Sequence, residues 1–310
     1  SGWCVRRGGE PVKPTARQLL CPLGGGKDSL VVFELLRNQA ESVVSWLYVS
    51  DGAGEFERSS RLRGIVARSG VPCHVFEHVF GYRQVADLRA RMHLGQGPRP
   101  AGHPWAALVS FDAALASVML GFDTIAVGNE HSANYGNGIF LEGDSGERLE
   151  VNHQFDKSLE FERAFHDYAQ EHMAPGVHYF SPLQNLWELQ IAQIFVSHLQ
   201  PYLDIFISCN NSSGNRSWCL TCEKCCFVFA MLAAFLDSGH ITRIFGKNLF
   251  NDLSLLPRFR ELIGERSSSD GASAAAKAQK PFECIGEPAE ALLALALARA
   301  RYHRADAAAG

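Results

Sequence analysis

The sequence lacks several features that would place it at a membrane or on nucleic acid. It has no run of the roughly 18 apolar residues that a membrane-spanning helix needs. Its start, Ser1-Gly2-Trp3, does not begin the charged head and apolar stretch of a secretory signal. Basic residues are not in excess either, because 29 Lys and Arg stand against 33 Asp and Glu. These absences predict a soluble, cytoplasmic protein whose main partner is neither a membrane nor a nucleic acid.

The composition indicates a folded chain with reduced cysteines. Its 310 residues are 46% hydrophobic, which excludes disordered and fibrous classes and allows one large domain with a smaller part attached. We find no internal repeat. There are nine cysteines, an odd number, and four of them lie within seventeen residues. This pattern favours metal ligation or free thiols over a disulfide framework.

Strand-like and helix-like segments alternate in the first half of the chain. The strand-like runs cover residues 18–23, 43–50, 73–80 and 124–128. Apolar helices are expected at 29–37 and 104–120. This alternation predicts an α/β fold with a doubly wound parallel sheet, in which ligands bind beyond the carboxyl ends of the strands.

The second half is expected to be more helical. Asn185 and Glu188 are spaced like a capping box before a helix over residues 186–199. Residues 267–280 are low in complexity and are typical of a linker, after which a short motif precedes a helix over 289–301. We therefore expect an α/β domain over residues 15–205 and a helical C-terminal part over 206–310.

A glycine-rich segment separates the first predicted strand from the first predicted helix: Gly24, Gly25, Gly26, Lys27, Asp28 and Ser29. Three glycines let backbone N–H groups face an anion, and the helix adds its positive N-terminal end. The spacing fits neither a Walker loop nor a dinucleotide-binding fingerprint. It resembles the signature of the PP-loop ATP pyrophosphatases, with Gly24 in place of the usual first serine. That resemblance implies ATP as a substrate and an aspartate, here Asp28, that helps to hold Mg²⁺.

The alternative for this segment is a glycine-rich turn that only packs tightly. Two further segments fit the PP-loop pattern: Ser50-Asp51-Gly52, where Asp51 would help to bind adenine, and Gly102-His103-Pro104. For each of these two, an ordinary turn is an equally good explanation.

Four cysteines have close, regular spacing: Cys209, Cys219, Cys222 and Cys225. Thiolates at this spacing can converge on one tetrahedral Zn²⁺, and sites made only of cysteine are normally structural. Reduced thiols and an iron–sulfur or redox site are the alternatives, and Cys226 is expected to be a buried apolar residue. The spacing also resembles that of 7-cyano-7-deazaguanine synthase, a PP-loop enzyme. That likeness makes purine-analogue or tRNA modification the alternative function.

Three polar motifs supply further candidate site residues. Gly128, Asn129 and Glu130 follow the fourth predicted strand, at the sheet edge where a nucleotide is expected, and His131 comes next. Residues 152–158 contain His153 and Lys157, and residues 280–287 contain Cys284. Each histidine alone is as well explained by a structural role, and the last motif by a segment that docks the C-terminal helix.

Taken together, residues 24–29, 128–134, 152–158, 218–229 and 280–287 resemble the bacterial UDP-N-acetylmuramoyl-L-alanyl-L-glutamate epimerases. The resemblance implies adenylation of the terminal L-glutamate of the precursor, inversion of its α-carbon, and release of AMP and pyrophosphate. Asp28 would serve catalysis through magnesium, and the acid/base candidates are His131, His153, Lys157 and Cys284. Family members carry a further N-terminal region, so the resemblance implies a missing region or a partner subunit. A non-catalytic nucleotide-binding or zinc-stabilised module is the remaining alternative.

Overall fold

The structure is a computed structural model in which residues 16–39, 42–50, 52–78, 88, 91–92, 104–209, 217–265 and 280–309 are described. Three segments discussed above fall wholly or partly outside this set. Asp51 and the Gly102-His103 pair lie outside the described residues, as does the predicted linker up to residue 279.

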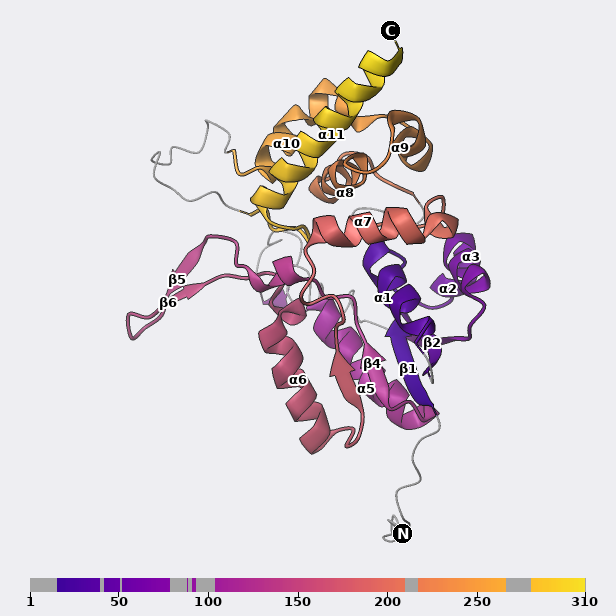
Figure 1. Ribbon diagram of the computed structural model, residues 1–310. Coiled ribbons are helices and arrows are strands. Elements are labelled where there is room, and N and C mark those ends of the chain that lie inside the picture. Colours follow the sequence, from indigo (N-terminus) through magenta and orange to yellow (C-terminus); the bar gives the residue numbers. More distant parts are fainter. Residues whose placement is uncertain are drawn as a thin grey trace, which may run out of the picture.

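A five-stranded parallel sheet organises the first two thirds of the chain (Figure 1). Its strand order is β3-β2-β1-β4-β7, with every neighbouring pair parallel. The strands are β1 (Arg17–Pro22), β2 (Ser42–Ser50), β3 (Cys73–Glu77), β4 (Thr124–Ala126) and β7 (His178–Phe180). Because the chain winds outward from β1 in both directions, the predicted doubly wound α/β sheet is confirmed.

Helices cover both faces of this sheet. Leu19, Cys21 and Trp46 point to one face, which is covered by α1 (Lys27–Arg37), α3 (Ser60–Ser69) and α7 (Glu188–His198). Leu20, Leu47 and Val49 point to the other face, which packs on α5 (Trp105–Leu120) and α6 (Leu159–His172). Successive strand residues face opposite sides, so burial on both sides explains why these strands are apolar almost throughout.

The C-terminal part is a group of helices around α8 (Glu223–Ala233). All residues of α8 from Lys224 to Ala233 are buried. Its neighbours are α9 (Ser238–Phe245), α10 (Leu256–Leu262) and α11 (Pro288–Ala309). Figure 1 shows α7 lying between the sheet and this group, so the predicted helical part with its cysteines sits beyond the carboxyl ends of the strands.

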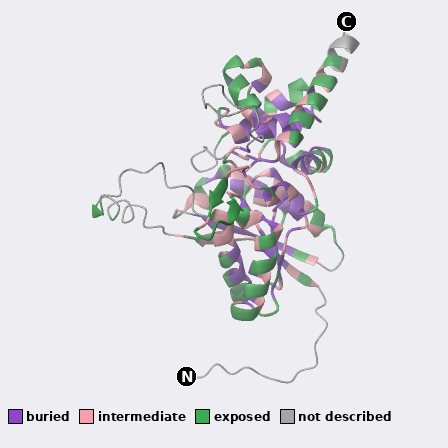
Figure 2. Cartoon of the chain, turned by 90° about the vertical axis from the view of Figure 1, so that its left-hand side faces the viewer, coloured by how far each residue is buried: buried purple, intermediate pink, exposed green. Residues whose placement is uncertain are grey.

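Short elements complete the described chain. They are the helix α2 (Glu55–Arg58) and the 3₁₀ turns η1 (His131–Asn134), η2 (Phe155–Lys157), η3 (Gln200–Tyr202), η5 (Leu249–Asn251) and η6 (Leu253–Leu255). An antiparallel hairpin of β5 (Phe140–Glu142) and β6 (Arg148–Glu150) projects from the body (Figure 1) and is exposed on both strands (Figure 2). Among the described helices, none combines the length and the apolar character needed to cross a membrane.

One predicted helix start is wrong. The helix begins at Glu188 and its N-cap is Trp187, whose backbone N–H donates to Gln190 Oε1 at 3.0 Å. Asn185 belongs to a separate turn, closed by a bond from Leu186 N to Leu183 O at 2.8 Å. Since that turn uses the local backbone and Trp187 is extended, the helix cannot begin earlier. The predicted strand over 73–80 also ends at Glu77, and the one over 124–128 ends at Ala126.

Candidate active site

The glycine-rich loop joins the carboxyl end of β1 to the N-terminus of α1. Gly25 has φ +73°, a left-handed conformation that favours glycine. A Cβ on Gly25 would lie 2.5 Å from Arg61 Nη1, and one on Gly26 would lie 2.6 Å from Ser208 Oγ. Gly26 is the N-cap and supplies no side-chain cap. The loop therefore presents backbone to its surroundings, as an anion-binding turn requires.

Lys27 of this loop points into the protein. Its side chain is fully buried, and its ammonium pairs with the carboxylates of Asp28 and Glu188. Burial opposes the charge, but Asp28 and Glu188 outweigh it and raise the pKa of Lys27 above its usual range. The loop's own lysine is thus neutralised by two acidic groups, one of which comes from α7.

Glu188 links the loop to the C-terminal part. It is buried, and besides Lys27 it lies 3.6 Å from the ammonium of Lys224 on α8. Burial raises the pKa of its carboxyl, but Lys27 and Lys224 outweigh this and hold the pKa below its usual range. Lys224 also donates to the backbone carbonyl of Cys284. Sequence reasoning missed both residues, although each is a charge at the start of a helix that is otherwise largely apolar.

The segment after β4 packs directly on the loop. A Cβ on Gly128 would lie 3.1 Å from the carbonyl carbon of Asp28, so the two backbones are in close contact. The next residue, Asn129, is fixed by Ser181, whose Oγ accepts from Asn129 N at 3.1 Å and donates to Asn129 O at 2.7 Å. Glu130 follows and is buried. The pKa of Glu130 is raised to about 7, mainly by burial and next by the nearby carboxylate of Glu188.

Both ring nitrogens of His131 have partners. Its Nδ1 donates to the carbonyl of Gln184 at 3.1 Å, and its Nε2 lies 3.3 Å from the Tyr135 hydroxyl. The ring also packs edge-on against Trp187, with centroids 4.5 Å apart. These contacts fix the position of the His131 ring.

His153 is half-buried and lies beside the C-terminal motif. Its Nδ1 is 3.2 Å from the amide of Asn137, and its ring lies 5.7 Å from that of Phe282. Burial, then the ammonium groups of Lys280 and Lys157, lower the pKa of His153 to about 4. Its imidazole is therefore neutral at pH 7.

The structure brings Lys157 and Cys284 together, although 127 positions separate them in the sequence. The Lys157 side chain makes a hydrogen bond with the Cys284 sulfur, and Cys284 is the largest cause that raises the pKa of Lys157 above its usual range. Glu130 is a further attractive partner of the same ammonium. Electrostatic interactions of Lys157 therefore link three segments that are separate in the sequence.

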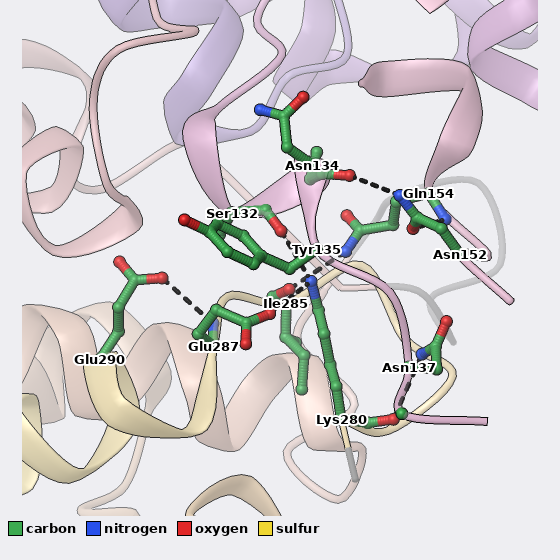
Figure 3. Close-up of polar contacts among 12 residues, drawn as sticks. Ser132, Asn134, Tyr135, Asn137, Asn152, Gln154, Lys280, Ile285, Glu287 and Glu290 are labelled. Carbon is green, nitrogen blue, oxygen red and sulfur yellow. Dashed lines mark hydrogen bonds and ion pairs between the residues drawn. The ribbon is translucent and has the colours of Figure 1, made fainter. Parts of the chain in front are cut away.

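The C-terminal motif is held in place by polar contacts to the segment between β4 and α6 (Figure 3). Lys280 Nζ donates to Ser132 O at 2.9 Å and lies 3.4 Å from Glu287 Oε1. Asn137 Nδ2 donates to Lys280 O at 3.2 Å, and Gln154 Nε2 donates to Ile285 O at 3.1 Å. The motif therefore does dock on the α/β part, and this docking brings Cys284 to Lys157.

The four cysteines form a compact group at the start of α8: Cys209, Cys219, Cys222 and Cys225. Their sulfur atoms all lie within 4.8 Å of one another, with 4.0 Å between Cys209 and Cys222 and 3.7 Å between Cys219 and Cys225. Four Zn–S bonds of about 2.3 Å in a tetrahedron place the sulfurs about 3.8 Å apart. The arrangement therefore fits one metal ion. Cys226 is fully buried in the core, as expected.

Comparisons with known proteins agree with each other. The model of the MurL N-terminal domain matches residues 6–182, and that of the MurL C-terminal domain matches residues 205–309. The UDP-N-acetyl-alpha-D-muramoyl-L-alanyl-L-glutamate epimerase of Xanthomonas oryzae pv. oryzae is 34% identical over 289 residues, which cover 91% of this chain and 57% of that protein. The one of Salinispora tropica is 34% identical over 287 residues, covering 91% and 55%. The chain thus spans about half the length of these relatives.

A solved structure is only distantly similar. The U34-tRNA thiolase NcsA from Methanococcus maripaludis, with its 4Fe-4S cluster, gives a TM-score of 0.39 at 16% sequence identity, covering 66% of this chain and 64% of that one. Similarity at that level does not bear on function. The two domain models account for most of the sequence, and the chain belongs to the MurL family.

Proposed function

We propose that the chain carries the catalytic site of an ATP-dependent epimerase. It adenylates the terminal L-glutamate of a UDP-N-acetylmuramoyl-L-alanyl-L-glutamate-type peptide, inverts the α-carbon to the D configuration, and releases AMP and pyrophosphate. One observation carries the proposal. The glycine-rich turn is linked through Glu188 and Lys224 to the backbone of Cys284, whose thiol interacts with Lys157.

The turn supports the ATP half of the reaction. Gly24, Gly25 and Gly26 with the first turn of α1 would hold the phosphates, and Asp28 beside them would help to hold Mg²⁺. Gly128 packs against this turn, and Gly128 with the following Asn129 and Glu130 would border the nucleotide. Ser29, whose hydroxyl lies 3.2 Å from Gly26 O, helps to shape the turn.

The contact between Lys157 and Cys284 supports the inversion half. A free carboxylate makes the neighbouring Cα proton very weakly acidic, because its removal would create a dianion. Joining the carboxylate to AMP removes that charge, so that a nearby base can form an enolate. A proton returned to the opposite face then gives the D configuration. Lys157, held protonated beside Cys284, would stabilise the enolate charge.

The four cysteines would hold one structural Zn²⁺ that fixes the start of α8. All four ligand positions are protein thiols, which leaves no open position for substrate. Lys224 lies between two of these ligands, so the same turn would also orient the contacts to Cys284 and Glu188.

Recognition of the UDP-muramoyl portion would fall to chain beyond the matched region. The relatives have a large part without a counterpart here, because the matches cover 55–57% of their lengths. Such a part would bind the sugar nucleotide in the same chain or in a partner subunit. ATP and UDP-linked precursors would place the reaction in the cytoplasm.

The reaction is tested in deuterated water with UDP-N-acetylmuramoyl-L-alanyl-L-glutamate, ATP and Mg²⁺. We expect deuterium at the glutamyl α-carbon, and no incorporation without ATP or with an analogue that cannot be cleaved between its α- and β-phosphates. Exchange that proceeds without ATP, or ATP consumption that leaves the carbon unlabelled, would contradict the epimerase proposal.

Asp28→Ala is the matching loop variant. It removes a partly exposed carboxylate and no core volume, so we expect a folded protein that forms no AMP. Wild-type AMP release by this variant would remove Asp28 from the ATP site.

A further inference from the structure

We propose that Ser208 is a positioning residue of the glycine-rich loop, and that through it the four-cysteine site controls how tightly ATP is bound. Ser208 touches the loop at Gly26 and Lys27, and the next residue along the chain is Cys209, the first of the four cysteines. This inference rests on the ATP half of the proposed function and deepens it, because it names what holds the ATP site in shape.

The segment formed by Ile207 and Ser208 lies against the glycine-rich loop. Ile207 N donates to Gly25 O at 3.1 Å. Ser208 Oγ accepts from Lys27 N at 3.4 Å, at the first residue of α1. A Cβ on Gly26 would lie 2.6 Å from Ser208 Oγ and 3.7 Å from Ile207 O, so the two stretches of chain are in close contact. The segment therefore holds the loop at the residue before Gly26 and at the residue after it.

Arg61 of α3 adds a second donor to the same loop carbonyl. Its Nη1 donates to Gly25 O at 2.9 Å. A carbonyl oxygen has two lone pairs, so Arg61 and Ile207 together fix the direction of the Gly25 carbonyl. Arg61 belongs to the α/β part, whereas Ile207 leads into the cysteines. The shape of the loop thus depends on contacts from both parts of the chain.

The same segment also belongs to the four-cysteine site. Ile207 is buried in one cluster with three of the four cysteines, namely Cys209, Cys222 and Cys225. The fourth, Cys219, donates from its backbone N–H to Cys209 Sγ at 3.4 Å. A metal ion held by the four thiolates would tie Cys209 to the start of α8. Because Ser208 is the neighbour of Cys209 in the chain, this attachment would also fix the Ser208 hydroxyl against the loop.

ATP affinity should therefore depend on the metal site. Backbone groups bind phosphate tightly only when their directions are fixed in advance. Without the ion, Cys209 would lose its attachment to α8, and Ser208 would no longer be held against Lys27. Coupling between two sites is reciprocal, so ATP should tighten metal binding by the same factor by which the metal tightens ATP binding. This reciprocity allows a test that needs no catalytic turnover.

The first measurement is the Kd of ATP with Mg²⁺ and without peptide, so that no adenylate forms. Ser208→Ala should bind ATP about 3- to 10-fold more weakly than the wild type, in line with the loss of one hydrogen bond, and should keep its zinc. Ser254→Ala is the matched control, because it removes a serine hydroxyl that bonds Asp252 Oδ1 at 2.6 Å on an exposed turn. This control should bind ATP like the wild type.

The second measurement is zinc affinity, by competition with a zinc-selective chromogenic chelator in excess Mg²⁺. Each protein is measured without ATP and with ATP at ten times its own Kd, so that mass action stabilises both folded proteins equally. ATP should tighten zinc binding about 5-fold or more in the wild type and in Ser254→Ala. In Ser208→Ala this gain should be smaller, because the contact that links the two sites is missing.

Three outcomes would overturn the coupling: unchanged ATP affinity in Ser208→Ala, equal zinc affinity with and without ATP in a wild-type protein that binds ATP, or a protein that binds no zinc. If Ser208→Ala proves unstable, the wild-type comparison alone decides. A wild-type protein that binds no ATP would instead contradict the proposed function itself.

Discussion

His153 is the residue whose charge the fold suppresses most clearly. Its pKa is lowered to about 4, whereas an unfolded histidine titrates near 6.5. Between these values the unfolded chain binds more protons than the folded one, so this residue's contribution to stability is lost as the pH falls from about 6.5 to 4. The raised pKa values of Glu130 and Glu290 act in the opposite direction at acid pH.

We therefore predict that the pH dependence of stability differs between the wild-type protein and a His153 variant. His153→Gln should lose less stability than the wild type on acidification, by up to about 3 kcal/mol between pH 7 and pH 4. Urea unfolding at several pH values measures this. Parallel stability curves for the two proteins would mean that His153 is not held neutral.

The pair formed by Lys27 and Glu188 gives a second prediction at this scale. Removing one partner of a buried ion pair leaves an uncompensated charge and typically costs about 3–5 kcal/mol. Lys27→Met should therefore destabilise strongly, and Lys27→Met with Glu188→Met should destabilise by less than the sum of the two single changes. Additive effects in urea unfolding would show that the two side chains do not interact. Arg63→Met, on the exposed side of α3, serves as the neutral control.

Contacts between residues far apart in the chain could not be predicted from the sequence. The glycine loop was predicted because its glycines are consecutive in the chain. The inward direction of the Lys27 side chain was not predicted, because it depends on Glu188, 161 positions away. The contact between Lys157 and Cys284 was out of reach for the same reason.

Among the elements, the long apolar ones were predicted and the short exposed ones were not. The first four sheet strands and the helices α1, α5, α7 and α11 were predicted from their apolar runs. The strand β7 has three residues like β4, but it starts with an exposed histidine, whereas all three residues of β4 are buried. Both strands of the β5–β6 hairpin are exposed, so no apolar periodicity reveals them. An apolar pattern can be recognised only in an element that is long enough and buried, and these three strands are short and largely exposed.

Helix α8 supplies a prediction about metal. Leu220, between the second and third cysteines, has φ +63°, a conformation that costs energy for a residue with a side chain and fits a turn closed around an ion. We expect about one zinc per chain. Cys222→Ser should lower both the zinc content and the stability, the latter on the order of 5 kcal/mol, since metal binding is coupled to folding.

Cys226→Ser is the control for this element. Cys226 lies on the same helix, is fully buried and is outside the four-sulfur group. Its replacement should reduce the melting temperature without changing the zinc content. Metal analysis that finds no zinc in protein never exposed to chelators would favour reduced thiols.

At the scale of the whole molecule, the site depends on how the C-terminal motif is seated between α7 and α8. A Cβ on Gly286 would lie 2.9 Å from Phe227 Cζ and 3.2 Å from Glu188 Cγ. Gly286→Ala should push the motif outward and separate Cys284 from Lys157. We expect inversion to fall about 10-fold or more while AMP release continues, since small displacements of catalytic groups have large effects on rate.

Gly239→Ala on α9 is the matched control. Its Cβ would meet only Asp237 Oδ1 at 3.3 Å and Arg243 Nη1 at 3.8 Å, away from the site. This variant should keep both activities. Equal behaviour of the two alanine variants would show that the seating of the motif does not govern the reaction.

The order of the strands also determines when the sheet can form during synthesis. Strand β1 precedes the other strands of this sheet in the chain and becomes the central one, and its pairing with β4 must wait until residue 124 has emerged, 102 positions after Pro22. At about 5–20 residues per second, the ribosome needs roughly 5–20 s to supply that partner. During this time one edge of β1, with the buried Leu19, Leu20 and Cys21, has no neighbour. We therefore expect chaperones to bind the nascent chain at this stage, and slower translation before residue 124 should increase its aggregation.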